Sequence, residues 1–129
     1  MQAAEILKLT PAGLYCEAGD FYIDPTRAVN RAVITHGHSD HARAGHGAVL
    51  ATKETLAIMA ERYCERFAGA TQVLRYGEEI KLAETRVTLT PAGHILGSAQ
   101  ALVQAKGGRV VVSGDYKRAR DPTCPPFEP

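Results

Sequence analysis

Short apolar runs alternate with turn signals along most of this chain, and the pattern predicts a molecule built mainly from β-strands. The run at residues 31–35 is centred on the apolar residues Ala32-Val33-Ile34, so we expect it to form a strand that is buried on both faces. The last two runs flank Lys106-Gly107-Gly108, which is typical of a hairpin turn. In full, the pattern predicts strands at residues 20–24, 31–35, 48–51, 71–75, 79–82, 86–90, 99–105 and 109–113.

One segment has helical periodicity instead. Apolar residues recur from Leu56 to Phe67 at intervals of three and four, and charged residues occupy the opposite face. Thr52 has the side chain of an N-cap, and Gly69 can end a helix. The sequence therefore predicts one main helix at about residues 53–68, with its apolar stripe packed in the core.

Composition sets the size and class of the molecule. At 129 residues the chain has room for one domain at most, and 45% hydrophobic with 22% charged residues is ordinary for a soluble globular protein. The net charge of +1 argues neither for nor against a nucleic-acid partner. Three widely spaced cysteines indicate reduced thiols and a cytoplasmic location. No apolar run approaches the length of a membrane span, so we expect no membrane association.

Potential metal ligands are crowded together at the end of one predicted strand. Three of the five histidines, His36, His38 and His41, lie within six residues together with Asp40. Imidazole and carboxylate are ligands that zinc accepts, and manganese can replace zinc in such a set. A polar loop with an accidental run of histidines is the alternative, but the concentration of three of five in one segment argues against it. The sequence therefore predicts a metal site here.

Their spacing suggests two metals rather than one. Residues 36 and 38 are two apart, so in extended backbone both imidazoles point the same way and can share a metal. If Ser39 caps a short helix, Asp40 and His41 are directed toward a second metal.

Three more candidates also stand where predicted strands end. Asp24 closes the first strand, His94 follows the strand at residues 86–90, and Asp115 follows the last strand. His94 would complete a three-imidazole set and leave a position open for water, the pattern of catalytic zinc. Asp115 could lie between two metals with one oxygen toward each.

Four segments resemble the metallo-β-lactamase-fold superfamily of dinuclear metal hydrolases, and within it the β-CASP nucleases. They are Phe-Tyr-Ile-Asp-Pro at 21–25, Thr-His-Gly-His-Ser-Asp-His-Ala at 35–42, Pro-Ala-Gly-His-Ile-Leu-Gly-Ser-Ala-Gln at 91–100 and Ser-Gly-Asp-Tyr-Lys at 113–117. The histidine cluster is specific to the superfamily, whereas the segments around His94 and Asp115 indicate the nuclease branch. The sequences of these segments are most similar to those of bacterial ligase-associated DNA exonucleases and mRNA 3′-end-processing-factor-like exonucleases.

The resemblance implies an α/β fold (α+β in some schemes), the αββα sandwich. Residues 1–129 would then be a partial domain, the N-terminal half, without the C-terminal half and the β-CASP insert. The implied activity is cleavage of RNA or DNA phosphodiesters by a metal-activated hydroxide, with one or two zinc ions, or manganese, as cofactor.

The resemblance also implies a role for each candidate residue. His36, His38 and His94 would bind the first metal, Asp40 and His41 the second, and Asp115 would bridge them. Asp40, His41 and Asp115 would thus take part in catalysis. Asp24 would support the ligand loop from outside the metal shell, the alternative being a simple strand-ending turn before Pro25. Lys117 and Arg118 are candidates for contacts to backbone phosphates, with an ordinary solvent role as the alternative.

The departures from the family pattern lead to further expectations. No histidine follows Asp115, so the second metal should bind weakly and the chain by itself should be inactive. One sheet should lack its partner layer, which would drive homo-oligomerisation or domain swapping. A small-molecule hydrolase for thioesters or lactams, and a non-catalytic metal-binding or self-associating module, remain as alternative functions.

Overall fold

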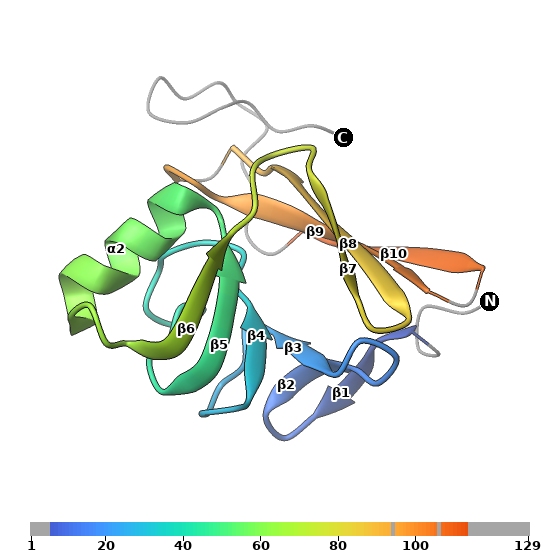
Figure 1. The fold of residues 1–129 in the computed structure, drawn as a ribbon, viewed down its shortest axis with the longest axis horizontal. Coiled ribbons are helices and arrows are strands. Elements are labelled where there is room, and N and C mark those ends of the chain that lie inside the picture. Colours follow the sequence, from blue (N-terminus) through green and yellow to red (C-terminus); the bar gives the residue numbers. More distant parts are fainter. Residues whose placement is uncertain (1–5, 94, 106, 114–129) are drawn as a thin grey trace.

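The computed structural model describes residues 6–93, 95–105 and 107–113, which form two β-sheets and one main helix (Figure 1). Six strands build the first sheet in the order of the chain: β1 (Lys8–Thr10), β2 (Gly13–Cys16), β3 (Phe21–Ile23), β4 (Arg31–Val33), β5 (His46–Ala51) and β6 (Ala68–Val73). The sheet is mixed, because β1, β2 and β3 pair antiparallel whereas β3, β4, β5 and β6 are parallel.

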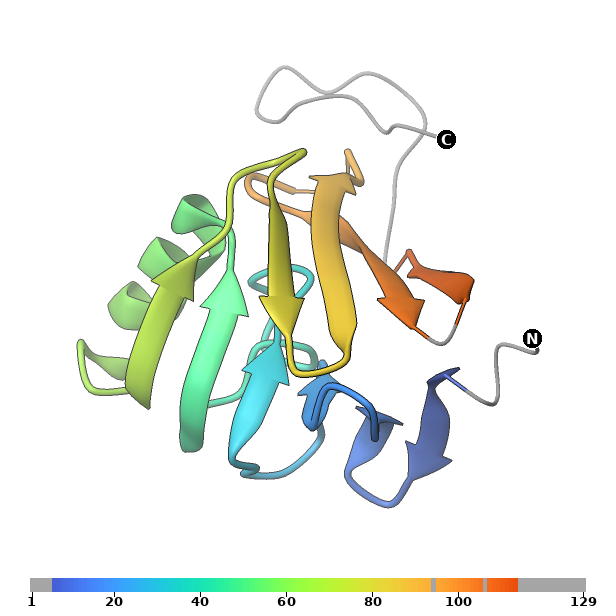
Figure 2. The same cartoon turned by 45° about the vertical axis from the view of Figure 1, so that its right-hand side comes forward.

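The second sheet has four antiparallel strands in the order β10-β9-β8-β7. They are β7 (Glu79–Leu82), β8 (Thr85–Pro91), β9 (Ala99–Ala105) and β10 (Gly108–Val112). The hairpin turn predicted between β9 and β10 is present, and Gly107 adopts a φ of 77° there. In Figure 2, β7 and β8 run nearly upright, as β4, β5 and β6 do, whereas β9 runs obliquely.

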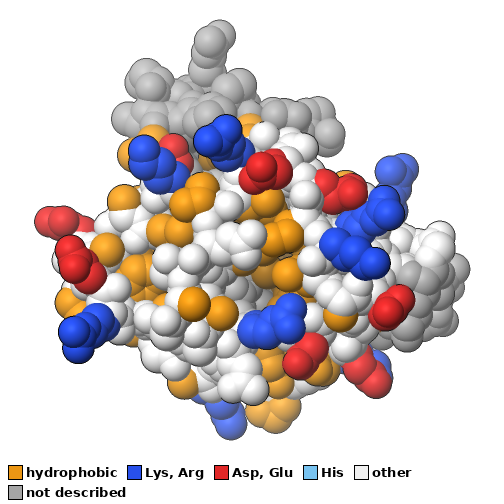
Figure 3. Space-filling view, in the orientation of Figure 1, with side chains coloured by type: hydrophobic (Ala, Val, Ile, Leu, Met, Phe, Trp, Pro, Cys, Tyr) orange, Lys and Arg blue, Asp and Glu red, His pale blue; other side chains and the backbone are white. Residues whose placement is uncertain are grey.

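The two sheets face each other across the larger core. Phe21, Val33 and Leu50 of the first sheet pack in one cluster with Val87, Leu89 and Val103 of the second. The expectation that one sheet lacks its partner layer is therefore wrong, because β7 to β10 already supply that layer. An apolar groove of about 150 Å³ still opens between the sheets, with Leu50 and Ala70 on one wall and Leu82 on the other. Hydrophobic side chains gather in a hollow near the middle of the face shown in Figure 3.

The helix α2 (Lys53–Tyr63) covers the outer face of the first sheet. Leu56 and Met59 pack there against Ile34 and Val49. Thr52 is its N-cap, as predicted, and the threonine side chain accepts a hydrogen bond from the Thr55 N–H. Among the described residues, no helix combines the length and the hydrophobicity that crossing a membrane requires.

The helix ends at Tyr63, five residues before the predicted end at residue 68. At Cys64 the backbone turns to a φ of 124°, and the chain then enters β6 at Ala68, opposite His46 of β5. Phe67 fits the helical spacing of apolar residues, which extended the predicted helix too far. In the structure it packs with Leu56 and Met59 from the connecting loop. The strands β1 and β2 were not predicted.

Candidate metal centre

The histidine-rich loop leaves the first sheet at the end of β4 and is fastened at once to both sheets. The Ile34 N–H donates to the Leu50 carbonyl of β5 over 3.0 Å, and the Thr35 carbonyl accepts from the Ala99 N–H of β9 over 2.7 Å. The buried run 32–34 thus holds the start of the loop in the core, as its apolar composition predicts. A loop fixed in this way presents its side chains with little freedom left to lose on binding.

The helix α2 holds the same loop from the other side. Arg62 donates to the Gly37 carbonyl over 2.5 Å, and the Tyr63 hydroxyl donates to the Ala42 carbonyl over 2.7 Å. A Cβ at residue 37 would lie 2.7 Å from the Cγ2 of Ile58, so any other residue would force the Ile58 side chain to shift. Between these supports the chain forms a turn, with the N–H groups of His41 and Ala42 both bonded to the His38 carbonyl. The short helix that Ser39 was considered to cap does not form; residues 39–41 are a turn.

Three imidazoles gather on this loop. The ring centroids of His36 and His38 are 5.1 Å apart, and those of His36 and His41 are 4.2 Å apart. His36 is fully buried, the His41 side chain is 23% exposed, and His38 faces solvent. The cluster therefore extends from the core to the surface. A site that binds a substrate needs such access from solvent.

Asp24 lies beneath the cluster and is held by three hydrogen bonds. Its Oδ1 accepts from the Thr35 N–H over 2.8 Å, and its Oδ2 accepts from the Thr35 hydroxyl over 2.5 Å. The same Oδ2 lies 2.8 Å from the His41 Nδ1. Asp24 sits just past β3 with a φ of 46°, which aims its carboxylate at the loop after β4.

These contacts assign the tautomers of two imidazoles. The Thr35 hydroxyl has one proton and gives it to Asp24, so in the 3.0 Å contact between Thr35 Oγ1 and His36 Nδ1 the imidazole is the donor. His41 likewise carries its proton on Nδ1, where the carboxylate of Asp24 accepts it. In its neutral form each ring then has its lone pair on Nε2, the form in which histidine binds a metal.

The donor set fits a divalent cation. Potential ligand atoms of Asp24, His36 and His41 all lie within 4.8 Å of one another. Three existing hydrogen bonds occupy the Asp24 carboxylate, which suits it to orient ligands rather than to bind the metal itself. The Asp40 side chain is 72% exposed, and its Oδ2 lies 3.5 Å from the His41 Nε2, so these two neighbours present an oxygen and a nitrogen side by side.

The segment 95–98, next to the predicted ligand at position 94, docks on the N-terminus of α2. The Gly97 carbonyl accepts hydrogen bonds from the hydroxyls of Thr52 and Thr55, over 2.7 and 3.1 Å. The Ser98 hydroxyl accepts from the Ile95 N–H over 3.2 Å and closes the turn. The predicted site residues His94, Asp115, Lys117 and Arg118 lie outside the described residues.

The other described histidine, His46, takes no part in this cluster. It is 2% exposed on β5, and its Nδ1 accepts from the Val29 N–H over 3.2 Å. Burial, and secondarily the charge of Arg43, lowers the pKa of this imidazole below its ordinary value. The ring is a neutral member of the core.

The profile of one protein family, described as the metallo-beta-lactamase superfamily, matches residues 24–128. The chain belongs to the metallo-β-lactamase superfamily. The predicted membership is thus confirmed, and the fold agrees with it, since two facing sheets carry a helix on an outer face.

Two curated relatives have names that refer to nucleic acid. A probable DNA ligase of Opitutus terrae is 35% identical over 88% of this chain and 11% of its own length. Ribonuclease TTHA0252 of Thermus thermophilus is 31% identical over 83% of the chain and 31% of its own length. The chain thus spans about a tenth to a third of these relatives, which are consistent with the β-CASP branch.

A solved structure supports the metallo-β-lactamase fold. The diiron beta-hydroxylase CmlA of Streptomyces venezuelae matches with a TM-score of 0.53 and 20% identity, over 73% of this chain and 22% of its own. At that identity the likeness concerns the fold alone.

Sequence reasoning missed three residues that build this metallo-β-lactamase site. Thr35 joins Asp24 to His36, and its place directly before the first ligand was the available signal. Arg62 and Tyr63 hold the loop from α2, but no local pattern shows that a helical side chain contacts a carbonyl 21 or 25 residues away.

Proposed function

We propose that this chain forms the N-terminal, metal-binding part of a nucleic-acid phosphodiesterase. The observation that carries the proposal is the convergence of His36, His38 and His41 above Asp24, with the Nε2 atoms of His36 and His41 in the form that binds a metal. The names of the two relatives favour nucleic acid over a thioester or a lactam.

Zinc is the metal we propose, with manganese as a substitute, because the described donors are imidazoles and carboxylates. His36, His38 and His94 would hold one ion, Asp40 and His41 a second, and Asp115 would bridge them. When bound, such ions supply a Lewis acid that activates water and stabilises negative charge on phosphate oxygens. Among the chain's own residues, Asp24 and Thr35 fix the imidazoles, while Lys117 and Arg118 would contact the phosphate backbone.

Zinc affinity tests the centre directly, whether or not the chain cleaves by itself. We expect His38→Ala and Asp40→Asn to weaken zinc binding in a competition titration with a chromophoric chelator. His46→Asn is the matched control, since it removes a histidine outside the cluster and should leave the affinity unchanged. Equal affinity in all four proteins would refute the metal centre.

Hydrolysis assays then separate the substrate classes. The metal-loaded full-length protein, of which we propose this chain to be the N-terminal part, is incubated with single-stranded RNA, single-stranded DNA and a thioester, and chelation serves as the control for metal dependence. Cleavage of the thioester alone would replace the nuclease proposal with the small-molecule hydrolase. Zinc binding with no hydrolysis of any of them would leave a metal-binding module.

We propose a cytoplasmic location for the protein, because its three cysteines are widely spaced and odd in number, which argues against a disulfide framework. We also propose that copies of the chain associate along β6. This strand ends the first sheet, five of its six residues are exposed, and the sequence Ala-Gly-Ala-Thr-Gln-Val carries neither charge nor proline. An uncharged open edge of this kind is a template for pairing with another strand.

A further inference from the structure

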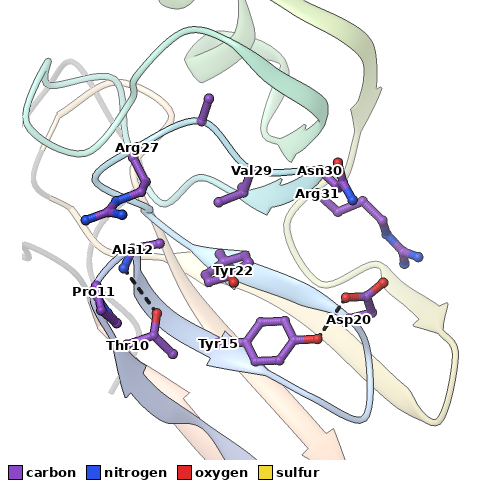
Figure 4. Close-up of a pocket in the computed structure, with 11 residues that line it drawn as sticks. Thr10, Pro11, Ala12, Tyr15, Asp20, Tyr22, Arg27, Val29, Asn30 and Arg31 are labelled. Carbon is purple, nitrogen blue, oxygen red and sulfur yellow. Dashed lines mark hydrogen bonds between the residues drawn. The ribbon is translucent and has the colours of Figure 1, made fainter.

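A second cavity lies on the outer face of the first sheet, away from the histidine cluster (Figure 4). Its volume is about 510 Å³, within the range of pockets that bind small molecules. The turn between β1 and β2, the strands β2 and β3, and the loop 24–31 enclose it. Nothing in the proposed metal chemistry uses these residues.

The floor of this cavity is aromatic. Tyr15 of β2 and Tyr22 of β3 are directly opposite in register, and their ring centroids lie 4.6 Å apart with the planes tilted by 39°. Both rings are partly exposed to the cavity. Two adjacent phenol rings at the surface provide π faces on which a planar group can stack.

Two arginines border the floor on opposite sides. In Figure 4, Arg27 lies on one side of the tyrosine pair and Arg31 on the other. Within the described part of the chain, neither guanidinium has an ion-pair or hydrogen-bond partner. Both cations can therefore take an external anion without breaking an existing contact.

The carboxylate in the cavity is already engaged. Asp20 accepts a hydrogen bond from the Tyr15 hydroxyl over 2.8 Å. This bond, reinforced by burial and by the Asp20 charge, raises the pKa of Tyr15 to about 12. The phenol stays neutral at physiological pH, so the floor adds no negative charge of its own.

We propose that this cavity binds a single-stranded segment of nucleic acid, with a base on Tyr15 and Tyr22 and flanking phosphates at Arg27 and Arg31. An aromatic platform between cations matches a polymer in which planar bases alternate with anionic phosphates. The choice of a polymer rests on the proposed function, whereas the base and phosphate chemistry rests on the cavity alone.

The cavity is close enough to the metal centre to act on the same strand. Arg27 is three residues beyond Asp24, so their Cα atoms are at most about 11 Å apart. The Thr26 N–H bonds to the Ala12 carbonyl over 2.7 Å, which fixes the loop between them to the β1–β2 turn. A strand bound at Arg27 is thereby led toward the loop that carries the histidines.

Binding without cleavage tests the site. A fluorescein-labelled oligo-dT or oligo-U of about ten nucleotides, within the usual footprint of ~4–16 nucleotides, is titrated with the chain in EDTA and followed by anisotropy. We expect Tyr22→Leu to weaken binding roughly five- to hundredfold. Arg27→Gln and Arg31→Gln should each weaken binding and lower the slope of log affinity against log salt by about 0.7 to 1.

Arg75→Gln is the matched control, since it removes one exposed positive charge outside the cavity. It should change affinity less than twofold. If Tyr22→Leu fails to fold by circular dichroism, Tyr22→Phe, which keeps the platform and should bind normally, is read together with Arg27→Gln. Equal weakening by Arg75→Gln and Arg27→Gln would overturn the site, because only diffuse charge would then attract the strand.

The outcome is separable from that of the metal centre. His38→Ala should keep oligonucleotide binding in EDTA while losing zinc affinity. Metal-dependent cleavage that survives Arg27→Gln and Tyr22→Leu with unchanged affinity would overturn the cavity and leave the proposed function standing. Oligonucleotide binding by the cavity in a protein that takes up no zinc would overturn the proposed metal centre and leave the cavity standing.

Discussion

The Thr35 hydroxyl donates to the Asp24 carboxylate over 2.5 Å and at the same time lies 3.0 Å from the His36 Nδ1. Through this one oxygen, a carboxylate on the loop after β3 sets the tautomer of an imidazole on the loop after β4. The same carboxylate holds His41 directly. Two ligands of the proposed centre therefore depend on Asp24, one of them only by way of Thr35.

Thr35→Val should lower zinc affinity about 10- to 100-fold, because an isosteric side chain without the hydroxyl leaves His36 free to turn or to change tautomer. Asp24→Asn should have a similar or larger effect, since it disturbs both imidazoles. Isothermal titration with zinc after chelator treatment measures the change. Thr35→Ser keeps the hydroxyl and should bind like the parent, and an equal loss in both Thr35 variants would contradict the relay.

Gly97→Ala should destabilise the fold by about 2–5 kcal/mol. Gly97 has a φ of 80°, which costs an L-residue about 1–2 kcal/mol. A Cβ there would also lie 2.7 Å from the Glu54 Cβ and 2.9 Å from the Thr55 backbone nitrogen, and overpacking costs about 1–3 kcal/mol more. Urea denaturation gives the free energy of unfolding.

Gly77→Ala is the matched control for that substitution. Its φ of 79° is almost the same, but nothing lies within 4 Å of the added Cβ, so only the backbone strain of about 1–2 kcal/mol should remain. The difference between the two variants isolates the docking of residues 95–98 on α2. Equal destabilisation would mean that this docking contributes nothing.

The strands that end at proposed ligands were predicted well, because their apolar runs are buried on the inner face or on both faces. The run 31–35 and the alternation at 86–90 correspond to β4 and β8. The strands β1 and β2 escaped prediction because they are short, and β1 shows its residues mostly to solvent. Pairing with β3 makes them strands, which a local pattern does not record.

In the candidate site, likewise, some parts could be predicted from the sequence and others could not. Ligand types and their placement at strand ends follow from residue identity and spacing, so the cluster at 36–41 could be found without coordinates. The supports are long-range contacts: Arg62 and Tyr63 contact the loop because α2, which packs on the sheet, ends beside it. The cavity over Tyr15 and Tyr22 depends on β2. Because the sequence did not predict that strand, it could not predict the cavity either.

Stability should fall in mild acid because of His46. Its pKa is lowered in the folded state by burial and by Arg43, so the unfolded chain takes up a proton on this ring at a higher pH than the folded chain does. The stability that the neutral His46 ring contributes is fully present above the ordinary histidine pKa of about 6.5. It is lost as the pH falls below that pKa.

Unfolding free energies measured in urea from pH 8 down to about pH 5 test this, with the parent compared to His46→Asn. The asparagine Oδ1 can replace Nδ1 as acceptor for the Val29 N–H but does not titrate in this range. The variant should be less stable at pH 8, since it leaves a small void, yet lose less stability on acidification. Parallel pH profiles would show that His46 is not the group responsible.

Self-association along β6 should depend on the charge of that edge. Val73 closes the strand and is 45% exposed, so Val73→Lys places a charge where a second copy would pair and should shift sedimentation equilibrium toward the monomer. Val111→Lys is the matched control, because Val111 is 57% exposed but lies in β10 of the other sheet. If Val111→Lys dissociates the assembly and Val73→Lys does not, association runs through the outer face of the second sheet instead. A parent chain that is monomeric at all concentrations would contradict both arrangements.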